Sequence, residues 1–171
     1  MKRIILAKSI KITLAAVAVL LFLLMTACTN TEEDMKQITS FDTITISITG
    51  TMASTEEYEL VRTADGVDFS YYSGGWNFNE DMDREECLIN RVAGNEENYQ
   101  QMLALLNECE VMEWNGFNES NPNVLDGESF SFSATVNDGT TISAGGSNAY
   151  PKNYATLLHA IEAIVLEKPM S

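Results

Sequence analysis

The chain has 171 residues, of which 25 are Asp or Glu and 10 are Lys or Arg, so its formal net charge is −15. Hydrophobic residues make up 45% of the sequence, which is enough for one domain with a substantial core. A chain with this much negative charge has little basic surface for phosphate groups. We therefore exclude nucleic acid as a partner.

The first 28 residues have the pattern of an export signal. Four basic residues lie among the first eleven, an apolar run extends from Ile12 to Met25, and a Thr-Ala-Cys sequence ends at Cys28. A short apolar run after a basic start is typical of a cleaved secretory signal. A membrane-spanning helix needs about 20 apolar residues, which this run reaches only if it extends back to Ile4. A plain secretory signal and an uncleaved anchor remain the alternatives.

The end of this segment resembles the lipobox of bacterial lipoproteins. Small residues stand directly before Cys28, although Met25 occupies the position where Leu is usual. The resemblance implies that residues 1–27 are removed and that Cys28 becomes a lipidated N-terminus, with acyl chains such as palmitate. Two chains are enough to hold a protein stably at a membrane. The predicted location is therefore the extracytoplasmic side of the cell membrane, with the lipid anchor as the contact to the bilayer.

Removal of the signal would leave residues 28–171, with all 25 acidic residues, six basic ones and a formal charge of −19. Residues 28–40 are polar and aperiodic, which predicts a tether after the lipidated cysteine. We expect a single domain over residues 41–171. Strong charge is typical of a soluble exported domain, and the alternative is that it attracts cations or a basic partner.

Two cysteines follow the predicted cleavage site, Cys87 and Cys109. Export would permit a disulfide between them. Cys109, however, falls on the apolar face of a predicted helix, and buried thiols are common. Their spacing matches no zinc motif, and the sequence has a single histidine. We treat the disulfide and two buried thiols as alternatives, and we predict no metal site.

The first half of the domain has the pattern of antiparallel strands. Residues 41–49 alternate between Ile and Thr or Ser, which predicts a strand with one buried face. Residues 58–63 and 67–72 form the next pair, joined through Asp65-Gly66, a strong hairpin signal. Residues 87–92 indicate a further strand.

Two helices and a second hairpin complete the pattern. Asn95 is the expected N-cap of a helix that ends near residue 109. Residues 130–136 and 140–144 predict a hairpin, and a helix with an apolar stripe starts after Pro151. The sequence therefore predicts an α+β fold. We expect a mainly antiparallel sheet of about five or six strands, with the two amphipathic helices packed on one face.

The titratable residues form no recognisable catalytic set. The acidic stretch 81–86 fails as an EF-hand, because counting from Asn79 puts Arg84 where Gly is needed and Asn90 where Glu is needed. His159 has no nucleophile motif near it and is expected on the surface. The Gly-Gly pairs match no phosphate-binding loop. We assign no catalytic residue and no cofactor.

Aromatic residues near loops are the candidates for a ligand surface. Tyr72, Trp76, Trp114 and Phe117 stand at or near predicted loops beside many Asn residues. Flat rings with amide partners suit a groove for a sugar or a peptide. The alternative is that loops and the sheet bury them as packing residues.

Four segments, 114–117, 124–127, 130–132 and 147–151, are similar to a domain of uncharacterised bacterial surface lipoproteins. The resemblance implies a place in the cell envelope and assigns no functional residue. We therefore expect a membrane-anchored, non-catalytic module that binds an envelope protein, a peptide or a glycan, or that assists an envelope complex. The alternatives are a glycan-active enzyme with paired carboxylates and a calcium-stabilised structural module.

Overall fold

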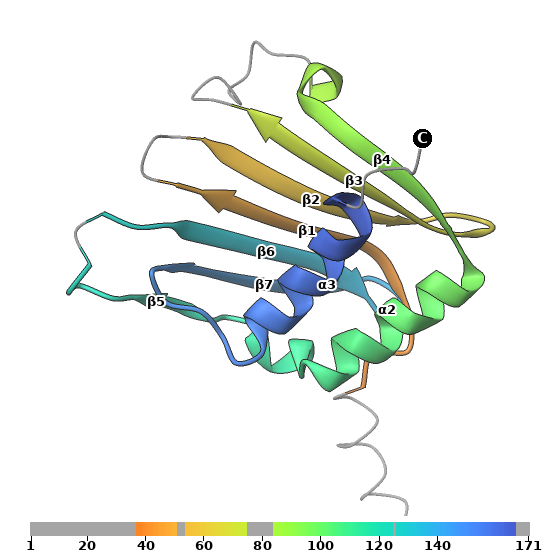
Figure 1. Ribbon diagram of the computed structural model, residues 1–171. Coiled ribbons are helices and arrows are strands. Elements are labelled where there is room, and N and C mark those ends of the chain that lie inside the picture. Colours follow the sequence, from red (N-terminus) through yellow and green to blue (C-terminus); the bar gives the residue numbers. More distant parts are fainter. Residues whose placement is uncertain (1–36, 51–53, 75–83, 125, 167–171) are drawn as a thin grey trace, which may run out of the picture. The chain divides into compact units, whose positions relative to one another are not determined.

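The computed structural model describes residues 37–50, 54–74, 84–124 and 126–166. Within them, one sheet has the strand order β4-β3-β2-β1-β6-β7-β5, and its pairs are antiparallel except β5 with β7 (Figure 1). The strands are β1 (Phe41–Thr49), β2 (Thr55–Arg62), β3 (Gly66–Gly74), β4 (Leu88–Asn95), β5 (Asn118–Ser120), β6 (Ser129–Val136) and β7 (Thr140–Ser147). The helices are α2 (Glu96–Glu108) and α3 (Tyr154–Leu166), with short 3-10 turns η1 (Arg84–Cys87) and η2 (Val111–Trp114).

The alternation in β1 places its apolar residues on one face of the sheet. Ile44 and Ile46 are fully buried, and Ile46 lies opposite Tyr58 of β2 and Phe132 of β6. This strand has the predicted bounds and lies near the centre of the sheet. Its apolar face therefore forms the middle of the core.

The other face of β1, β6 and β7 presents small hydroxyl side chains. Thr45 pairs with Ser133, which in turn pairs with Ser143, and Thr43, Thr135 and Thr141 form a second such row beside it. Because side chains alternate along a strand, these residues point away from the helices. This face therefore adds no apolar area to the core.

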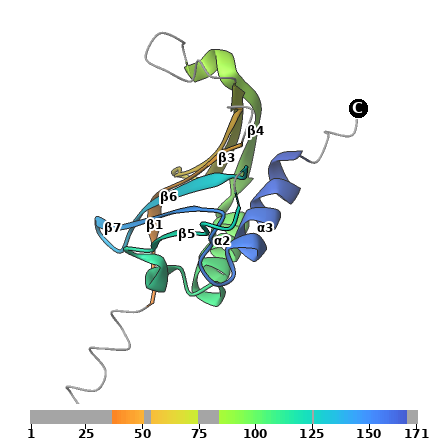
Figure 2. The same cartoon turned by 90° about the vertical axis from the view of Figure 1, so that its left-hand side faces the viewer.

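Both helices pack against the apolar face of the sheet (Figure 2). α2 starts at the predicted N-cap, where Asn95 and Asn98 exchange side-chain to backbone hydrogen bonds of 3.0 Å in each direction. This reciprocal capping satisfies two amide groups at the helix start. Its buried residues include Leu106, and those of α3 include Leu157 and Ile161. The predicted α+β fold with two helices on one face is confirmed.

The sheet has seven strands in the described residues, where the sequence predicted five or six. The additional strand, β5, lies in a segment predicted as a connection. Its three residues are exposed and show no alternation, so the sequence contains no signal for it. It forms because the amide of Gly116 donates to the carbonyl oxygen of Ser143, and the amide of Gly145 donates to that of Phe117.

The packed domain begins at Ile38 rather than after Ser40, which corrects the predicted end of the tether. The Ile38 side chain is buried, and its backbone is held by Asn107 of α2 through hydrogen bonds of 2.9 and 2.8 Å. The Asn137 side chain accepts hydrogen bonds from the amides of Thr39 and Ser40. A single apolar residue in a polar stretch gave no periodic signal, so the sequence analysis missed it.

The predicted signal, Cys28 and residues 28–36 of the tether lie outside the described residues, as do Trp76 and residues 79–83 of the acidic stretch. None of the helices that the structure describes is long and apolar enough to cross a membrane.

Candidate functional site

A pocket of about 540 Å³ lies at the start of α3. Its wall includes Ile48 of β1, Glu128 just before β6, and Tyr150, Tyr154, Ala155 and Leu158. We call it the α3 pocket. Aromatic and aliphatic side chains with a few polar groups are typical of sites for small organic ligands.

Three aromatic rings pack together at this pocket. The Tyr150 and Tyr154 rings stack with their centroids 5.0 Å apart, and Phe130 lies 5.3 Å from Tyr150 and 4.6 Å from Tyr154. Tyr150 is 42% exposed, whereas Tyr154 and Phe130 are buried. Tyr150 therefore forms the solvent-exposed rim, Tyr154 forms part of the wall, and Phe130 packs against both rings from outside the wall.

Trp114 and Phe117 contact these rings from outside the wall of the α3 pocket. The Trp114 ring is buried, and its centroid lies 6.0 Å from that of Tyr154. Phe117 is half-buried, and its ring centroid lies 6.2 Å from that of Phe130. The Trp114 indole N–H donates to the carbonyl oxygen of Lys152 at 3.1 Å, which fixes the chain just before α3. Burial removes Trp114 from any ligand surface, so that part of the sequence prediction is wrong and the packing alternative holds.

The loop before α3 is tied to the start of β6 by Asn148. The Asn148 amide donates to the carbonyl oxygen of Glu128 at 2.8 Å, and the Glu128 amide donates to the Asn148 side chain at 2.9 Å. Asn148 has a φ of 52°, a left-handed conformation that Asn tolerates better than most residues. This pair of bonds holds the Glu128 backbone beside the loop that leads to Tyr150.

The Tyr154 hydroxyl is buried and has no hydrogen-bond partner among the described residues. Burial, with the nearby Tyr150, Glu128 and Glu162, raises the pKa of Tyr154 well above its ordinary value of about 10. A buried hydroxyl without a partner costs about 1–3 kcal/mol, and most buried polar groups in proteins are paired. This unpaired hydroxyl therefore lowers the stability of the fold, and it is shielded from solvent.

The described wall of the α3 pocket has one charged residue, Glu128. Lys152 is adjacent in sequence, but its ammonium group pairs with Glu110 at 2.6 Å. Burial and the Glu128 carboxylate together raise the pKa of Tyr150. The Tyr150 hydroxyl and the Glu128 carboxylate thus give the pocket wall an oxygen-rich, negative region.

The backbone at the start of α3 offers this pocket few free donors. The Tyr154 amide donates to the carbonyl oxygen of Pro151, and the amides of Thr156 and Leu157 donate to that of Asn153. Helix starts attract anions through unpaired amides and the helix dipole. Here most of those amides are already occupied, and the Glu128 carboxylate would repel an anion.

Tyr72 lies on the opposite face of the sheet, where a polar network covers it. Its ring is buried beneath the Arg84 guanidinium group, which lies 4.4 Å from the ring centroid. Its hydroxyl donates to Glu59 at 3.2 Å and accepts a bond of 3.4 Å from Arg91. Tyr72 is therefore a packing residue, and its predicted place on a ligand surface is wrong.

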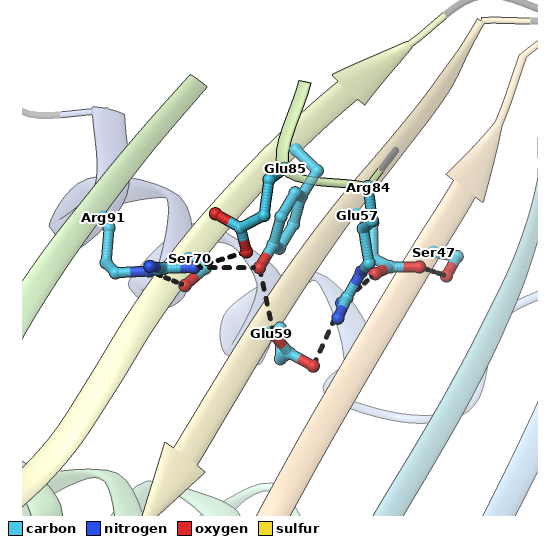
Figure 3. Close-up of polar contacts among 8 residues, drawn as sticks. Ser47, Glu57, Glu59, Ser70, Arg84, Glu85 and Arg91 are labelled. Carbon is cyan, nitrogen blue, oxygen red and sulfur yellow. Dashed lines mark hydrogen bonds and ion pairs between the residues drawn. The ribbon is translucent and has the colours of Figure 1, made fainter. Parts of the chain in front are cut away.

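The network that covers Tyr72 links four strands and η1. Arg84 bridges Glu57 and Glu59 of β2, and Arg91 of β4 contacts Glu85 (Figure 3). Ser47 and Ser70 extend it to β1 and β3. Each carboxylate named here has a cationic or hydroxyl partner. This arrangement is a structural brace between η1 and the sheet.

Both described cysteines carry thiols, and no disulfide joins Cys87 to Cys109. Cys109 belongs to the core between the helices and the sheet, whereas Cys87 ends η1 outside that core. The disulfide alternative is therefore wrong, because the fold buries the two thiols in separate places. Burial, with the charge of Glu108, raises the pKa of the Cys109 thiol.

His159 is exposed, as expected, and its imidazole contacts Glu162 at 2.9 Å on α3. It has no place in the wall of the α3 pocket. The described residues contain no group of three His, Cys, Asp or Glu side chains placed to hold a metal ion.

Comparison of the sequence with protein-family models and with curated proteins, and of the fold with solved structures, finds no match. The functional argument therefore rests on the residues of this chain.

The sequence analysis missed Glu128, Tyr150 and Tyr154 as a site. The apolar stripe expected after Pro151 includes Tyr154, which is buried, whereas Tyr150 lies before the helix starts. The helical spacing rule applies only within a helix, so no local pattern joins Tyr150 and Glu128 to Tyr154.

Proposed function

We propose that this chain is a lipoprotein, anchored through Cys28 on the extracytoplasmic side of the membrane, whose domain is a non-catalytic binding module. The α3 pocket is its ligand site. The observation that supports this proposal is the pocket itself, about 540 Å³ in volume, whose described wall combines the rings of Tyr150 and Tyr154 with aliphatic side chains and the Glu128 carboxylate. Such a wall can hold a small organic group or an exposed side chain of a partner.

A paired-carboxylate enzyme is less well supported by the same geometry. Acid–base cleavage of a glycan needs two carboxylates across one cleft. The described wall of the α3 pocket has one, Glu128, while Glu57 and Glu59 are both bound by Arg84 on the other face of the sheet. We therefore propose binding without catalysis, with the ligand supplied by an envelope peptide, protein or glycan.

The ligand site is tested by filling the pocket from the helix. Ala155 is exposed and lines the pocket, so Ala155→Trp places a large ring in it without disturbing the core. The matched control is Ala163→Trp, an exposed position on the same helix outside the pocket wall. The probe is phenol, and the sample is the lipidated full chain in a non-ionic detergent. Calorimetry should show that phenol binds to the wild type and to Ala163→Trp but not to Ala155→Trp. Equal binding to Ala155→Trp would refute the site.

The anchor is tested separately by metabolic labelling with a palmitate analogue. The wild-type chain should be labelled and found in the membrane fraction, and Cys28→Ala should be neither. Labelling that persists in Cys28→Ala would refute the lipoprotein proposal and leave the pocket unaffected.

A further inference from the structure

We infer that the α3 pocket selects an organic ammonium ion, an amine cation attached to a flat apolar body, over neutral and anionic molecules of the same shape. This inference rests on the proposed binding function and names its ligand class. Three features of the pocket support it: its acceptor atoms, its rings and its charge.

The polar atoms at the pocket are mainly acceptors. The Glu128 carboxylate can only accept when ionised, and the Tyr150 hydroxyl oxygen can accept a hydrogen bond as well. Glu128 and the exposed Tyr150 lie in the same pocket wall. An ammonium group has three N–H donors and no acceptor, so it complements such a set.

The rings supply the second feature. Aromatic faces attract cations, and they also stack against flat apolar groups. Tyr154 forms part of the wall, Phe130 packs against it, and the exposed Tyr150 presents its ring at the rim. Ile48 and Leu158 add aliphatic surface to the wall. An amine with an aryl group can therefore use the oxygens with its charged end and the rings with its body.

The negative charge of the pocket is the third feature, and it disfavours anionic ligands. Glu128 is the single charged group in the described wall, and the nearest cation in sequence, Lys152, is bound to Glu110. Glu162 lies close enough to raise the Tyr154 pKa, and its His159 partner points to the exposed side of α3. An anionic ligand would meet net negative charge, and a cation would meet attraction that salt weakens.

The test compares three probes of nearly equal shape on lipidated full chain in a non-ionic detergent at pH 7.5. Benzylamine is cationic, benzyl alcohol is neutral and benzoate is anionic. The expected order of affinity is benzylamine first, benzyl alcohol about tenfold weaker and benzoate without measurable binding. Nα-acetyl-lysine amide in the same titration distinguishes a small amine from the lysine side chain of a partner protein.

Two variants locate the effect in the pocket. Glu128→Gln removes the charge and should weaken benzylamine about tenfold, with little effect on benzyl alcohol. The matched control is Glu86→Gln, which makes the same change in net charge on η1 and should leave both affinities unchanged. Tyr150→Phe should weaken benzylamine about fivefold, because the accessible hydroxyl acceptor is lost.

The outcomes separate this inference from the proposed function. Equal affinity for benzylamine and benzyl alcohol, or equal losses in Glu128→Gln and Glu86→Gln, would overturn the ammonium inference and leave the pocket as a binding site. Failure of all the probes, phenol included, would overturn both.

Discussion

Replacing Tyr154 by Phe should stabilise the protein, which is unusual for a substitution at a buried position. The Tyr154 side chain is 5% exposed, and its hydroxyl has no partner among the described residues. Leaving such a group unpaired costs about 1–3 kcal/mol, and Phe keeps the ring while removing the hydroxyl. The ring contacts with Tyr150, Phe130 and Trp114 should remain. We expect a gain of about 1 kcal/mol, which is a rise of about 4 °C in Tm for a domain of this size.

The assay is thermal unfolding of the lipidated full chain in detergent, followed by far-ultraviolet circular dichroism. Tyr99→Phe is the matched control with the opposite sign. The Tyr99 hydroxyl is buried too, but it accepts from the amide of Phe41 at 3.1 Å and donates to its carbonyl oxygen at 3.4 Å. Its loss leaves a buried amide unpaired and should cost about 1–3 kcal/mol. If Tyr154→Phe is destabilised as much as Tyr99→Phe, the hydroxyl has a partner in the folded protein and the reasoning is refuted.

Three further predictions follow from burial and close contact. Burial raises the pKa of Tyr58 and of Tyr154 in the folded state, so unfolding releases protons once the pH exceeds the unfolded pKa of about 10. The free energy of unfolding should therefore fall as the pH rises above about 10. Urea titrations at pH 9, 10 and 11 that give the same free energy of unfolding would contradict this. Gly146→Ala should lower the free energy of unfolding by about 1–3 kcal/mol, because the added Cβ would lie 2.2 Å from the backbone carbonyl oxygen of Ala149. Gly50→Ala is the control in the same urea assay, and it should be nearly neutral because its Cβ would lie 3.6 Å from the nearest atom, the Ser54 hydroxyl oxygen. The Cys109 thiol, buried and with a raised pKa, should react with a thiol reagent only in urea, and reaction in native buffer would show that its helix opens.

The sequence predicted secondary structure well where the hydrophobic pattern is regular. The alternation in β1 gave its bounds, and the N-cap at Asn95 gave the start of α2. In both, neighbouring residues define the element, because hydrogen bonds and side-chain spacing are local in the chain. β5 was missed, since it exists only through its pairing with β7.

The candidate site could be predicted only in part. Trp114 and Phe117 were singled out as aromatic residues near loops. Trp114 is buried against Tyr154, and Phe117 contacts Phe130 and lines a separate hollow beside Asn115 and Asn118. The residues that form its wall come from β1, from the start of β6 and from the loop and first turn of α3. Which ring faces outward depends on how the loop after β7 folds back over β6, and no local pattern encodes that.

By itself the sequence determined the α+β class, the strong negative charge and the helices and strands that have a regular hydrophobic pattern along the chain. The tertiary structure alone decided which aromatic rings are buried, that Cys87 and Cys109 are kept apart, and that Glu128 lies beside Tyr150 and Tyr154. The physical reason is that burial and electrostatic contact depend on distances between segments far apart in the chain. Those distances are set by strand pairing and helix packing, and both are properties of the whole fold.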